Sequence, residues 1–142
     1  MRIGGLIFLD TPVRGANLSR MGHSFSVAEA ADRLRRKRNR RVAECEARRR
    51  AAQRTAREVA RLLAETDPSI ERIIGFGSTF EEWRAFRMDS DIDLGIIGGD
   101  WFRLMREIPE SEIEISLIEL DKQPGPFFDH VVRNGVILYE KR

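Results

Sequence analysis

The feature that most constrains folding is a run of residues from Ser26 to Leu63 that contains no glycine and no proline. Alanine, arginine, glutamate and leucine dominate this run, and all four are good helix formers. Ser26 and Glu29 have the spacing of a capping box, in which each side chain satisfies a free backbone N–H of the other residue. The run therefore predicts one helix of about 38 residues, about 57 Å long, which is longer than a small domain.

The apolar residues of this run lie loosely at helical spacing and are concentrated in its last four turns. At that end we expect a set of side chains to pack on a hydrophobic core, namely Ala56, Val59, Ala60, Leu62 and Leu63. The first part of the helix has a thin apolar stripe, so we expect it to project or to pack on another chain. Pro68 cannot continue the helix and ends it.

After Pro68 short apolar stretches alternate with turns. Strands are predicted over Ile70–Phe76, Ile92–Ile97, Ile113–Leu120 and Val136–Tyr139, and helices over Phe80–Phe86, Trp101–Ile108 and Phe127–Arg133. Strands mixed with helices over about 75 residues predict a compact α/β (α+β) domain. We therefore expect three parts: a poorly ordered arm or edge strand within residues 1–24 (the strand over Ile3–Leu9), a long Arg-rich helix over residues 25–66, and the mixed domain over residues 67–142.

The net charge of +2 conceals a strong separation of charge. Residues 33–61 hold 13 Lys or Arg against 3 Glu, and the rest of the chain carries a net charge of −8. Like charges one helical turn apart repel each other, and an acidic partner would relieve that repulsion. Three alternatives stay open: a solvated helical face, a nucleic-acid partner bound through its phosphates, or an acidic protein surface, including a second copy in a homodimer through the basic helix.

Composition excludes several classes of protein. The single cysteine, Cys45, excludes an internal disulfide framework and a Cys-rich zinc site. No apolar run approaches the roughly 20 residues of a membrane span. The apolar patch Leu6–Leu9 is too short for a signal peptide. We expect a cytoplasmic protein with no membrane partner.

Two carboxylates stand at the head of the second predicted strand. Asp91 and Asp93 are two residues apart, so both side chains point to one face. They repel each other unless a cation or a proton sits between them. Mg²⁺ suits such oxygen ligands and takes substrate phosphates as further ligands. Upstream, a predicted strand runs into Gly77 and Ser78 at a predicted helix N-terminus, which suits a phosphate. The two features together predict nucleotide chemistry.

A strand, then Gly77-Ser78, then Ser90-Asp91-Ile92-Asp93-Leu94 resembles the minimal nucleotidyltransferases of the DNA polymerase β-like superfamily. The resemblance covers roughly residues 69–140 and implies a small mixed sheet flanked by helices, here preceded by the long basic helix. It implies that Asp91 and Asp93 are catalytic and bind Mg²⁺, that Gly77 and Ser78 hold the triphosphate of ATP, and that a third carboxylate comes from a later strand.

This chain departs from the family pattern at two places. The family typically has a second Gly and an Arg shortly after Gly-Ser. Here the path to Ser90 is about two residues longer and lacks that Gly. Arg84 and Arg87, together with Ser90, are therefore the candidates for binding the phosphates. The later carboxylate of the family falls on Ser116. Glu114, two residues earlier on the same strand face, is the candidate third catalytic residue and metal ligand, about 6 to 7 Å further along the strand.

The resemblance implies a Mg²⁺-dependent transfer of a nucleoside monophosphate, AMP from ATP, to a hydroxyl of a protein, an RNA or a small molecule. Ser116 is a poor substitute for a charged ligand, which keeps a second hypothesis open. The domain could be a catalytically degenerate antitoxin or regulatory binding module, because small relatives often pair with a helical HEPN-type protein in toxin–antitoxin systems. His130 has no partner pattern in the sequence and is interpreted as structural or exposed.

Overall fold

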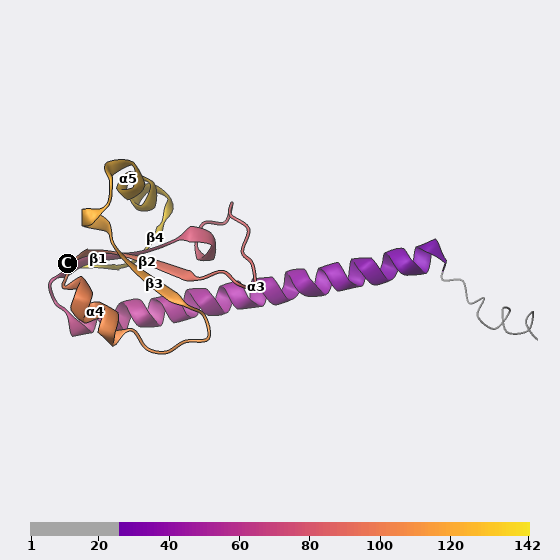
Figure 1. Cartoon of the computed structure of the whole chain (residues 1–142), viewed down its shortest axis with the longest axis horizontal. Helices are drawn as coiled ribbons and strands as arrows, with labels where there is room; N and C mark the ends of the chain where they lie inside the picture. The colour runs from indigo at the N-terminus through magenta and orange to yellow at the C-terminus, as the bar shows by residue number, and fades with distance from the viewer. Residues whose placement is uncertain (1–25) are drawn as a thin grey trace, which may run out of the picture. The chain divides into compact units, whose positions relative to one another are not determined.

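The computed structural model describes residues 26–142. The arm or edge strand predicted within residues 1–24 therefore lies outside the described residues. The chain divides into two units, Met1–Arg40 and Arg41–Arg142, and each is described by itself. The helix α3 (Val27–Thr66) supplies residues to both units (Figure 1).

The described part of the first unit is a capped, solvent-exposed helical segment. The predicted capping box is confirmed: the Ser26 N–H donates to Glu29 Oε2 at 3.2 Å, and the Glu29 N–H donates to Ser26 Oγ at 3.1 Å. Residues 26–40 are exposed except for Asp32, which forms an ion pair with Arg35 at 3.1 Å. Within residues 26–142 no helix combines the length and apolar character that crossing a membrane requires.

The second unit is built on a four-stranded sheet in the order β3-β2-β1-β4. In chain order its strands are β1 (Ile70–Phe76), β2 (Ile92–Gly98), β3 (Ile115–Glu119) and β4 (Val136–Glu140). β1 pairs antiparallel with both β2 and β4, and β3 pairs parallel with β2. The parallel pair is joined by a crossover through the helix α4 (Trp101–Glu107), and α5 (Gly125–Asn134) connects β3 to β4. The predicted mixed α+β class with a long N-terminal helix is confirmed.

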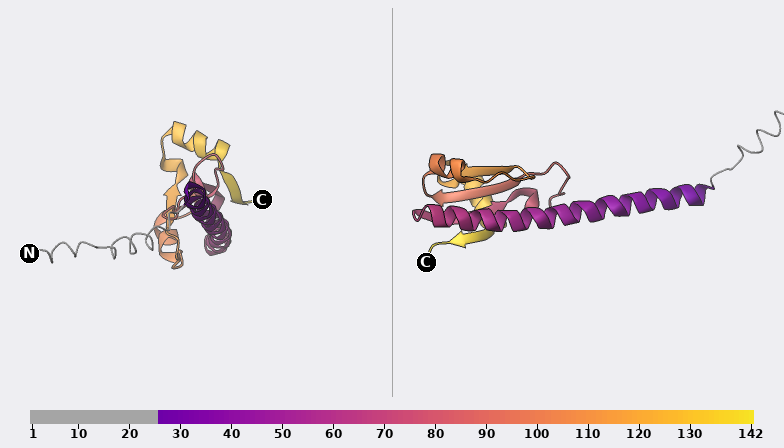
Figure 2. Two further views of the ribbon diagram at one scale, coloured as in Figure 1. Left: turned by 90° about the vertical axis from the view of Figure 1, so that its right-hand side faces the viewer. Right: turned by 90° about the horizontal axis from the view of Figure 1, so that it is seen from below.

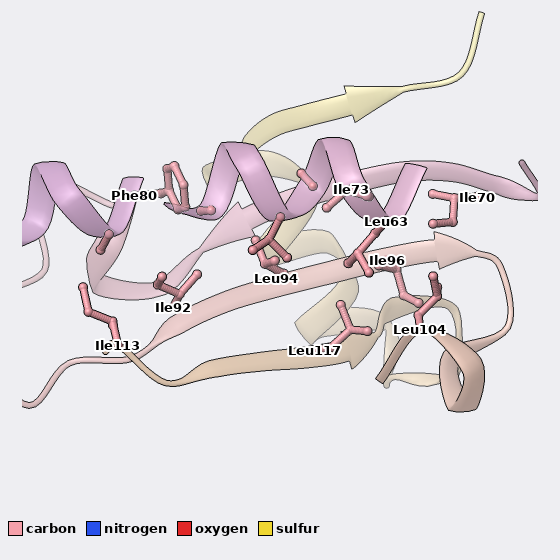
Figure 3. Close-up of a cluster of buried hydrophobic side chains, with 14 residues drawn as sticks. Leu63, Ile70, Ile73, Phe80, Ile92, Leu94, Ile96, Leu104, Ile113 and Leu117 are labelled. Carbon is pink, nitrogen blue, oxygen red and sulfur yellow. The ribbon is translucent and has the colours of Figure 1, made fainter. Parts of the chain in front are cut away.

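The C-terminal part of α3 covers one face of the sheet (Figures 1 and 2). It contributes five buried side chains to the larger core cluster, namely Ala52, Ala56, Val59, Ala60 and Leu63. These residues pack with apolar side chains of the sheet such as Ile73, Leu94 and Ile96, and Leu104 of α4 joins them (Figure 3). Leu62, which we expected in this core, is 41% exposed because it lies off the buried stripe.

The helix α5 covers the opposite face (Figure 1). Val131 is fully buried there with Ile74 and Phe76, and the rings of Phe76 and Phe127 meet edge to face with centroids 5.8 Å apart. α5 starts at Gly125, two residues before its predicted start, because Pro126 is tolerated in the first turn of a helix. With both faces covered, β1 is buried along most of its length.

The helix predicted over Phe80–Phe86 is absent, and that prediction is wrong. A 3₁₀ turn, η1 (Gly77–Thr79), follows β1, and the chain is irregular from there to β2. One helix-like bond forms, from the Glu81 N–H to the Gly77 oxygen at 2.8 Å. Most side chains after Glu81 are exposed, so no apolar face is buried to stabilise a helix.

Asp67 joins the end of α3 to the start of α4. Its Oδ1 accepts bonds from the backbone N–H and the hydroxyl of Ser69, at 3.0 and 2.5 Å, and its Oδ2 accepts the Asp100 N–H at 2.8 Å. Asp100 in turn caps α4 through the Arg103 N–H. The bond from the Ser69 hydroxyl, followed by those from the two backbone N–H groups, lowers the pKa of Asp67 below its ordinary 3.8. The ionised carboxylate is therefore the form that stabilises the fold.

We predict that Asp67→Asn lowers the free energy of unfolding at pH 7 by about 1 to 3 kcal/mol, because the asparagine amide has only one acceptor oxygen. It therefore cannot accept from both Ser69 and the Asp100 N–H, as the two carboxylate oxygens of Asp67 do. A lowered folded-state pKa adds stability above the unfolded value of 3.8 that is lost as the pH falls through the folded value. The difference from wild type should therefore narrow below pH 3.8, as urea denaturation at a series of pH values would show. Asp129→Asn, at an exposed position of α5, serves as the matched control. Equal stability of wild type and Asp67→Asn at pH 7 would contradict the prediction.

Candidate active site

The turn that follows β1 lies directly against the carboxylate of Asp93. Phe76, the last residue of β1, is the register partner of Asp93 in β2. Gly77 then adopts a positive φ of 72°, in the left-handed region that favours glycine. A Cβ atom at Gly77 would collide with the Asp93 carboxylate. Glycine is therefore required at this position both for the turn and for the close approach of Asp93.

The same turn is attached to α3 and to the start of β2. The Thr79 carbonyl accepts bonds from Gln53 Nε2 at 2.8 Å and from Arg49 Nε at 3.2 Å, both on α3. The buried Thr79 hydroxyl donates to the carbonyl of Asp91 at 3.0 Å. These bonds fix the turn relative to the residue that precedes β2. Gln53, Arg49 and Thr79 carry no local signal in the sequence, because their partners are distant along the chain.

Asp91 and Asp93 lie at the start of β2, with Asp91 exposed and Asp93 partly buried, and the charge of Asp91 acts on Asp93. The pKa of Asp93 is raised to about 6, mainly by burial and then by the negative charges of Asp91 and Glu81, against the opposing charge of Arg84. Crowded carboxylates of this kind favour a cation between them. Mg²⁺ is commonly held by one or two carboxylates, with waters and substrate phosphates as its other ligands, so the pair fits that ion.

Ser116 occupies the position beside Asp93 on the neighbouring strand. It is the register partner of Asp93 in the parallel pair of β2 and β3. Glu114 is exposed just before β3, where its carbonyl accepts the Ile92 N–H at 2.8 Å. In the described part of the chain, no three His, Cys, Asp or Glu side chains form a group that could hold a metal ion. The structure thus brings Asp91 and Asp93 together but does not gather Glu114 with them into such a group.

The remaining predicted residues differ in their surroundings. Arg84 lies at the site: its charge acts on Asp93, its Nε is 3.3 Å from Glu81 Oε2, and its guanidinium lies 4.8 Å from the centroid of the Trp83 ring. Arg87 forms an exposed ion pair with Asp89 at 3.5 Å. The Ser90 hydroxyl accepts the Arg87 N–H at 2.8 Å, so both residues bond within their own loop.

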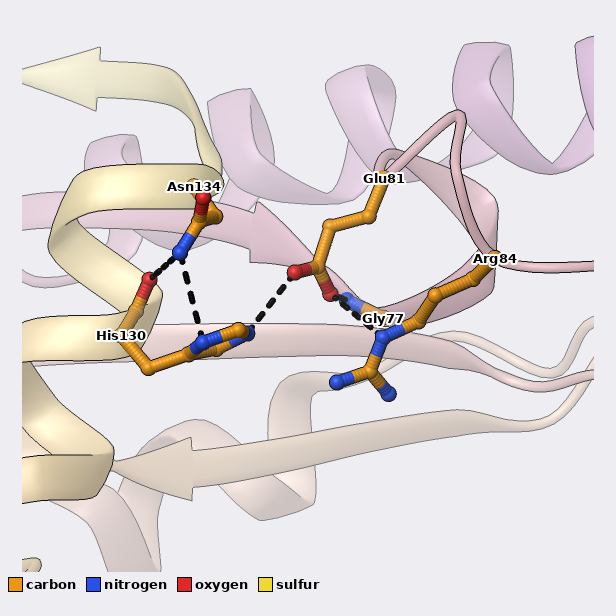
Figure 4. Close-up of polar contacts among 5 residues, drawn as sticks. All are labelled: Gly77, Glu81, Arg84, His130 and Asn134. Carbon is orange, nitrogen blue, oxygen red and sulfur yellow. Dashed lines mark hydrogen bonds and ion pairs between the residues drawn. The ribbon is translucent and has the colours of Figure 1, made fainter.

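Glu81 and His130 were missed as site residues. The Glu81 side chain is wholly buried; its Oε2 accepts the Gly77 N–H at 2.7 Å, and its Oε1 lies 2.9 Å from His130 Nε2 (Figure 4). His130 was interpreted from the sequence as structural or exposed. Its partner Glu81 is 49 residues away, so no local pattern could indicate the contact. The one local signal was an acidic residue four positions after a turn glycine, within reach of the glycine N–H.

Comparisons with known proteins bear on the family and the fold. The family model described as "Polymerase beta, Nucleotidyltransferase" matches residues 58–142. A chain from the crystal structure of a toxin–antitoxin with AMP-PNP is 19% identical, with a TM-score of 0.50 over 61% of this chain and 74% of that chain. A chain from the toxin–antitoxin MntA-HepT is 20% identical, with a TM-score of 0.46 over 63% and 73% of the two chains. No curated protein gives a significant match.

The raised pKa of Asp93 predicts an unusual dependence of stability on pH. A carboxyl with a raised folded-state pKa stabilises the fold below its unfolded pKa of 3.8, and that stability is lost as the pH rises through about 6. Asparagine is uncharged at every pH, so Asp93→Asn avoids the cost of ionising a partly buried carboxyl. At pH 7.5 in EDTA the substitution should therefore raise the free energy of unfolding by roughly 1 to 3 kcal/mol. The gain should vanish near pH 4. Asp121→Asn, exposed and outside the site, should show no such gain in the same urea titrations. A pH-independent effect of Asp93→Asn would exclude the electrostatic explanation.

Proposed function

Because the chain belongs to the polymerase β nucleotidyltransferase family, we propose that it transfers a nucleoside monophosphate, AMP from ATP, to a hydroxyl of a protein, an RNA or a small molecule in the presence of Mg²⁺. The observation that carries this proposal is the carboxylate pair of Asp91 and Asp93 at the head of β2. A Cβ atom at Gly77 would meet the Asp93 carboxylate, and the positive φ of Gly77 disfavours any other residue there. The pair is held in a repulsive arrangement that a divalent cation relieves.

The chain's own residues would divide the work as follows. Asp91 and Asp93 would hold Mg²⁺, which when bound supplies charge stabilisation for the attacking and leaving oxygens. The Ser78 hydroxyl makes no hydrogen bond to another residue of the described region 26–142 and is free to contact a phosphate. Arg84 would add positive charge beside it. The Gly77 N–H is already donated to Glu81, so its part is to shape the turn.

We predict that wild-type protein with ATP, Mg²⁺ and a suitable acceptor releases pyrophosphate, and that Asp93→Asn lowers the rate by about a hundredfold or more. An amide would hold Mg²⁺ more weakly than the carboxylate, so the charge stabilisation that the ion supplies would be lost. Asp121→Asn should retain wild-type activity. A coupled pyrophosphate assay measures both variants. Undiminished release by Asp93→Asn would show that the proposed mechanism is wrong.

A second candidate function is a binding module that retains the fold without catalysis. The observation that favours it is Ser116, which faces Asp93 where a third carboxylate would serve the metals. In that case the chain would pair with a HEPN-type protein as an antitoxin or regulator. The solved structure of the same fold with a TM-score of 0.50 is that of a toxin–antitoxin, which supports this pairing as a proposal.

Calorimetry separates the two candidates. If the chain is an enzyme, we expect ATP with Mg²⁺ to bind wild-type protein, and binding to weaken by about tenfold or more in Asp91→Ala, because one metal ligand is lost. If it is a binding module, wild-type protein should bind no ATP at millimolar concentration, while a complex with a HEPN-type protein should survive Asp91→Ala. The matched control is Asp89→Ala, two residues away in the exposed loop. Equal ATP binding by Asp91→Ala and wild type would exclude a metal-bridged nucleotide.

A further inference from the structure

The carboxylate of Glu81 is a costly feature that the proposed chemistry does not use directly. Its side chain has no exposed surface. Burying an ionised carboxylate costs several kcal/mol unless its partners replace the lost water. Three donors do so here: the Gly77 N–H, Arg84 Nε and His130 Nε2, at 2.7, 3.3 and 2.9 Å (Figure 4). A fully satisfied buried network of this kind fixes the geometry of the groups it joins.

The first arm of the network closes the turn on itself. Glu81 Oε2 accepts the Gly77 N–H, and the Glu81 N–H donates to the Gly77 carbonyl at 2.8 Å. The two residues therefore bond to each other through both backbone groups of Gly77. The bonds hold Gly77 at its φ of 72° and so fix the peptide that leads into Ser78.

The second arm reaches across to α5. Asn134 Nδ2 lies 3.3 Å from His130 Nδ1 and donates to the His130 carbonyl at 3.0 Å. An amide N–H pointing at Nδ1 makes that nitrogen the acceptor, which leaves the proton on Nε2, the atom facing Glu81. His130 keeps 36% of its side chain exposed, so it can be altered with less disturbance of the core than Glu81.

The third arm positions a charge. Arg84 Nε contacts Glu81 Oε2, and the guanidinium lowers the pKa of Asp93 against the effect of burial. The carboxylate thus holds Arg84 within electrostatic reach of the proposed metal site. Loss of Glu81 would release the arginine and the turn together.

The same donors could also serve a phosphate, in which case Glu81 would compete with the nucleotide. Burial argues against that alternative. A competing carboxylate would occupy an open site, whereas the Glu81 side chain is enclosed between the turn and α5. A nucleotide could displace it only by opening the loop. The two interpretations predict opposite effects on nucleotide affinity.

We propose that Glu81 is a positioning residue: its buried carboxylate sets the Gly77–Ser78 turn in its phosphate-binding shape and couples that turn to α5 through His130. The inference rests on the proposed function for its effect on nucleotide binding. The hydrogen-bonded link from Gly77 through Glu81 to His130, called the clamp below, is a property of the nucleotide-free protein and is tested without any ligand.

The first measurement is amide hydrogen exchange at Gly77 in nucleotide-free protein. His130→Ala should speed exchange of the Gly77 amide by about tenfold, because one charged hydrogen bond to Glu81 is lost. His130→Gln should restore most of the protection, since its side-chain amide can donate to the same oxygen. Arg133→Ala, exposed on the same helix, is the control and should leave Gly77 unchanged. Unchanged exchange in His130→Ala would overturn the coupling to α5.

The second measurement is the affinity for ATP with Mg²⁺, with Glu81→Gln and His130→Ala compared with wild type. Positioning predicts weaker binding in both, by about tenfold for Glu81→Gln, with rescue in His130→Gln. Tighter binding by Glu81→Gln would establish the competing carboxylate and overturn the proposal. If wild-type protein binds no ATP while the exchange pattern holds, the proposed function fails and the clamp stands. If wild type binds ATP and both variants match it, the positioning role fails and the proposed function stands. If Glu81→Gln does not fold, the comparison of His130→Ala with wild type still tests the positioning role.

Discussion

The packing of α3 on one face of the sheet is the interaction on which the rest of the second unit depends. Ala52, Ala56 and Ala60 recur every fourth residue and are fully buried, which brings the helix backbone close to the strands. The adjoining turns of the same helix supply Arg49 and Gln53, which bond the carbonyl of Thr79. The contact that covers the core therefore also sets the position of the turn after β1.

The turn after β1 is where unfavourable electrostatic energy is concentrated. Asp91, Asp93 and Glu81 place three carboxylates within mutual electrostatic influence, and Arg84 opposes them. Glu81 is compensated by its own donors, whereas Asp93 is not, because Gly77 presses against it without offering it a bond. The uncompensated charge is the one the proposed metal would neutralise. One buried acid thus shapes the turn, and its neighbour is available for chemistry.

Local patterns were sufficient for most of the fold. β1 was predicted with its observed bounds, because an isoleucine-rich stretch between Pro68 and Gly77 carries its own signal. The capping box of Ser26 and Glu29 is equally local. The helix predicted after Thr79 failed because a good helix-forming composition was overridden by tertiary contacts: Glu81 turns its carboxylate back to Gly77 and across to His130. No periodicity reports a contact over 49 residues.

The positions of some candidate residues could be predicted by counting along the strands. Asp91 and Asp93 share a strand head by a spacing of two. The family resemblance put the later carboxylate at Ser116, which the parallel register pairs with Asp93. The surroundings of Arg84 and Arg87 could not be separated by sequence, because both lie in the same irregular loop and only one has a buried carboxylate within reach. Exposure of that loop removes the periodicity that would have distinguished them.

Ser116 and Asp93 favour different interpretations of the domain. Ser116 removes a charge from the position where a third ligand would help, which favours a module without catalysis. Asp93 argues in the other direction, since a partly buried carboxylate with a pKa near 6 destabilises the fold at neutral pH, and asparagine would fill the same space without that penalty. A residue that lowers the stability of the fold, when a neutral residue of the same size would not, is expected at functional sites. Because Mg²⁺ can be held by two carboxylates and the substrate's phosphates, the pair of Asp91 and Asp93 supports the proposed transfer even without a third acid.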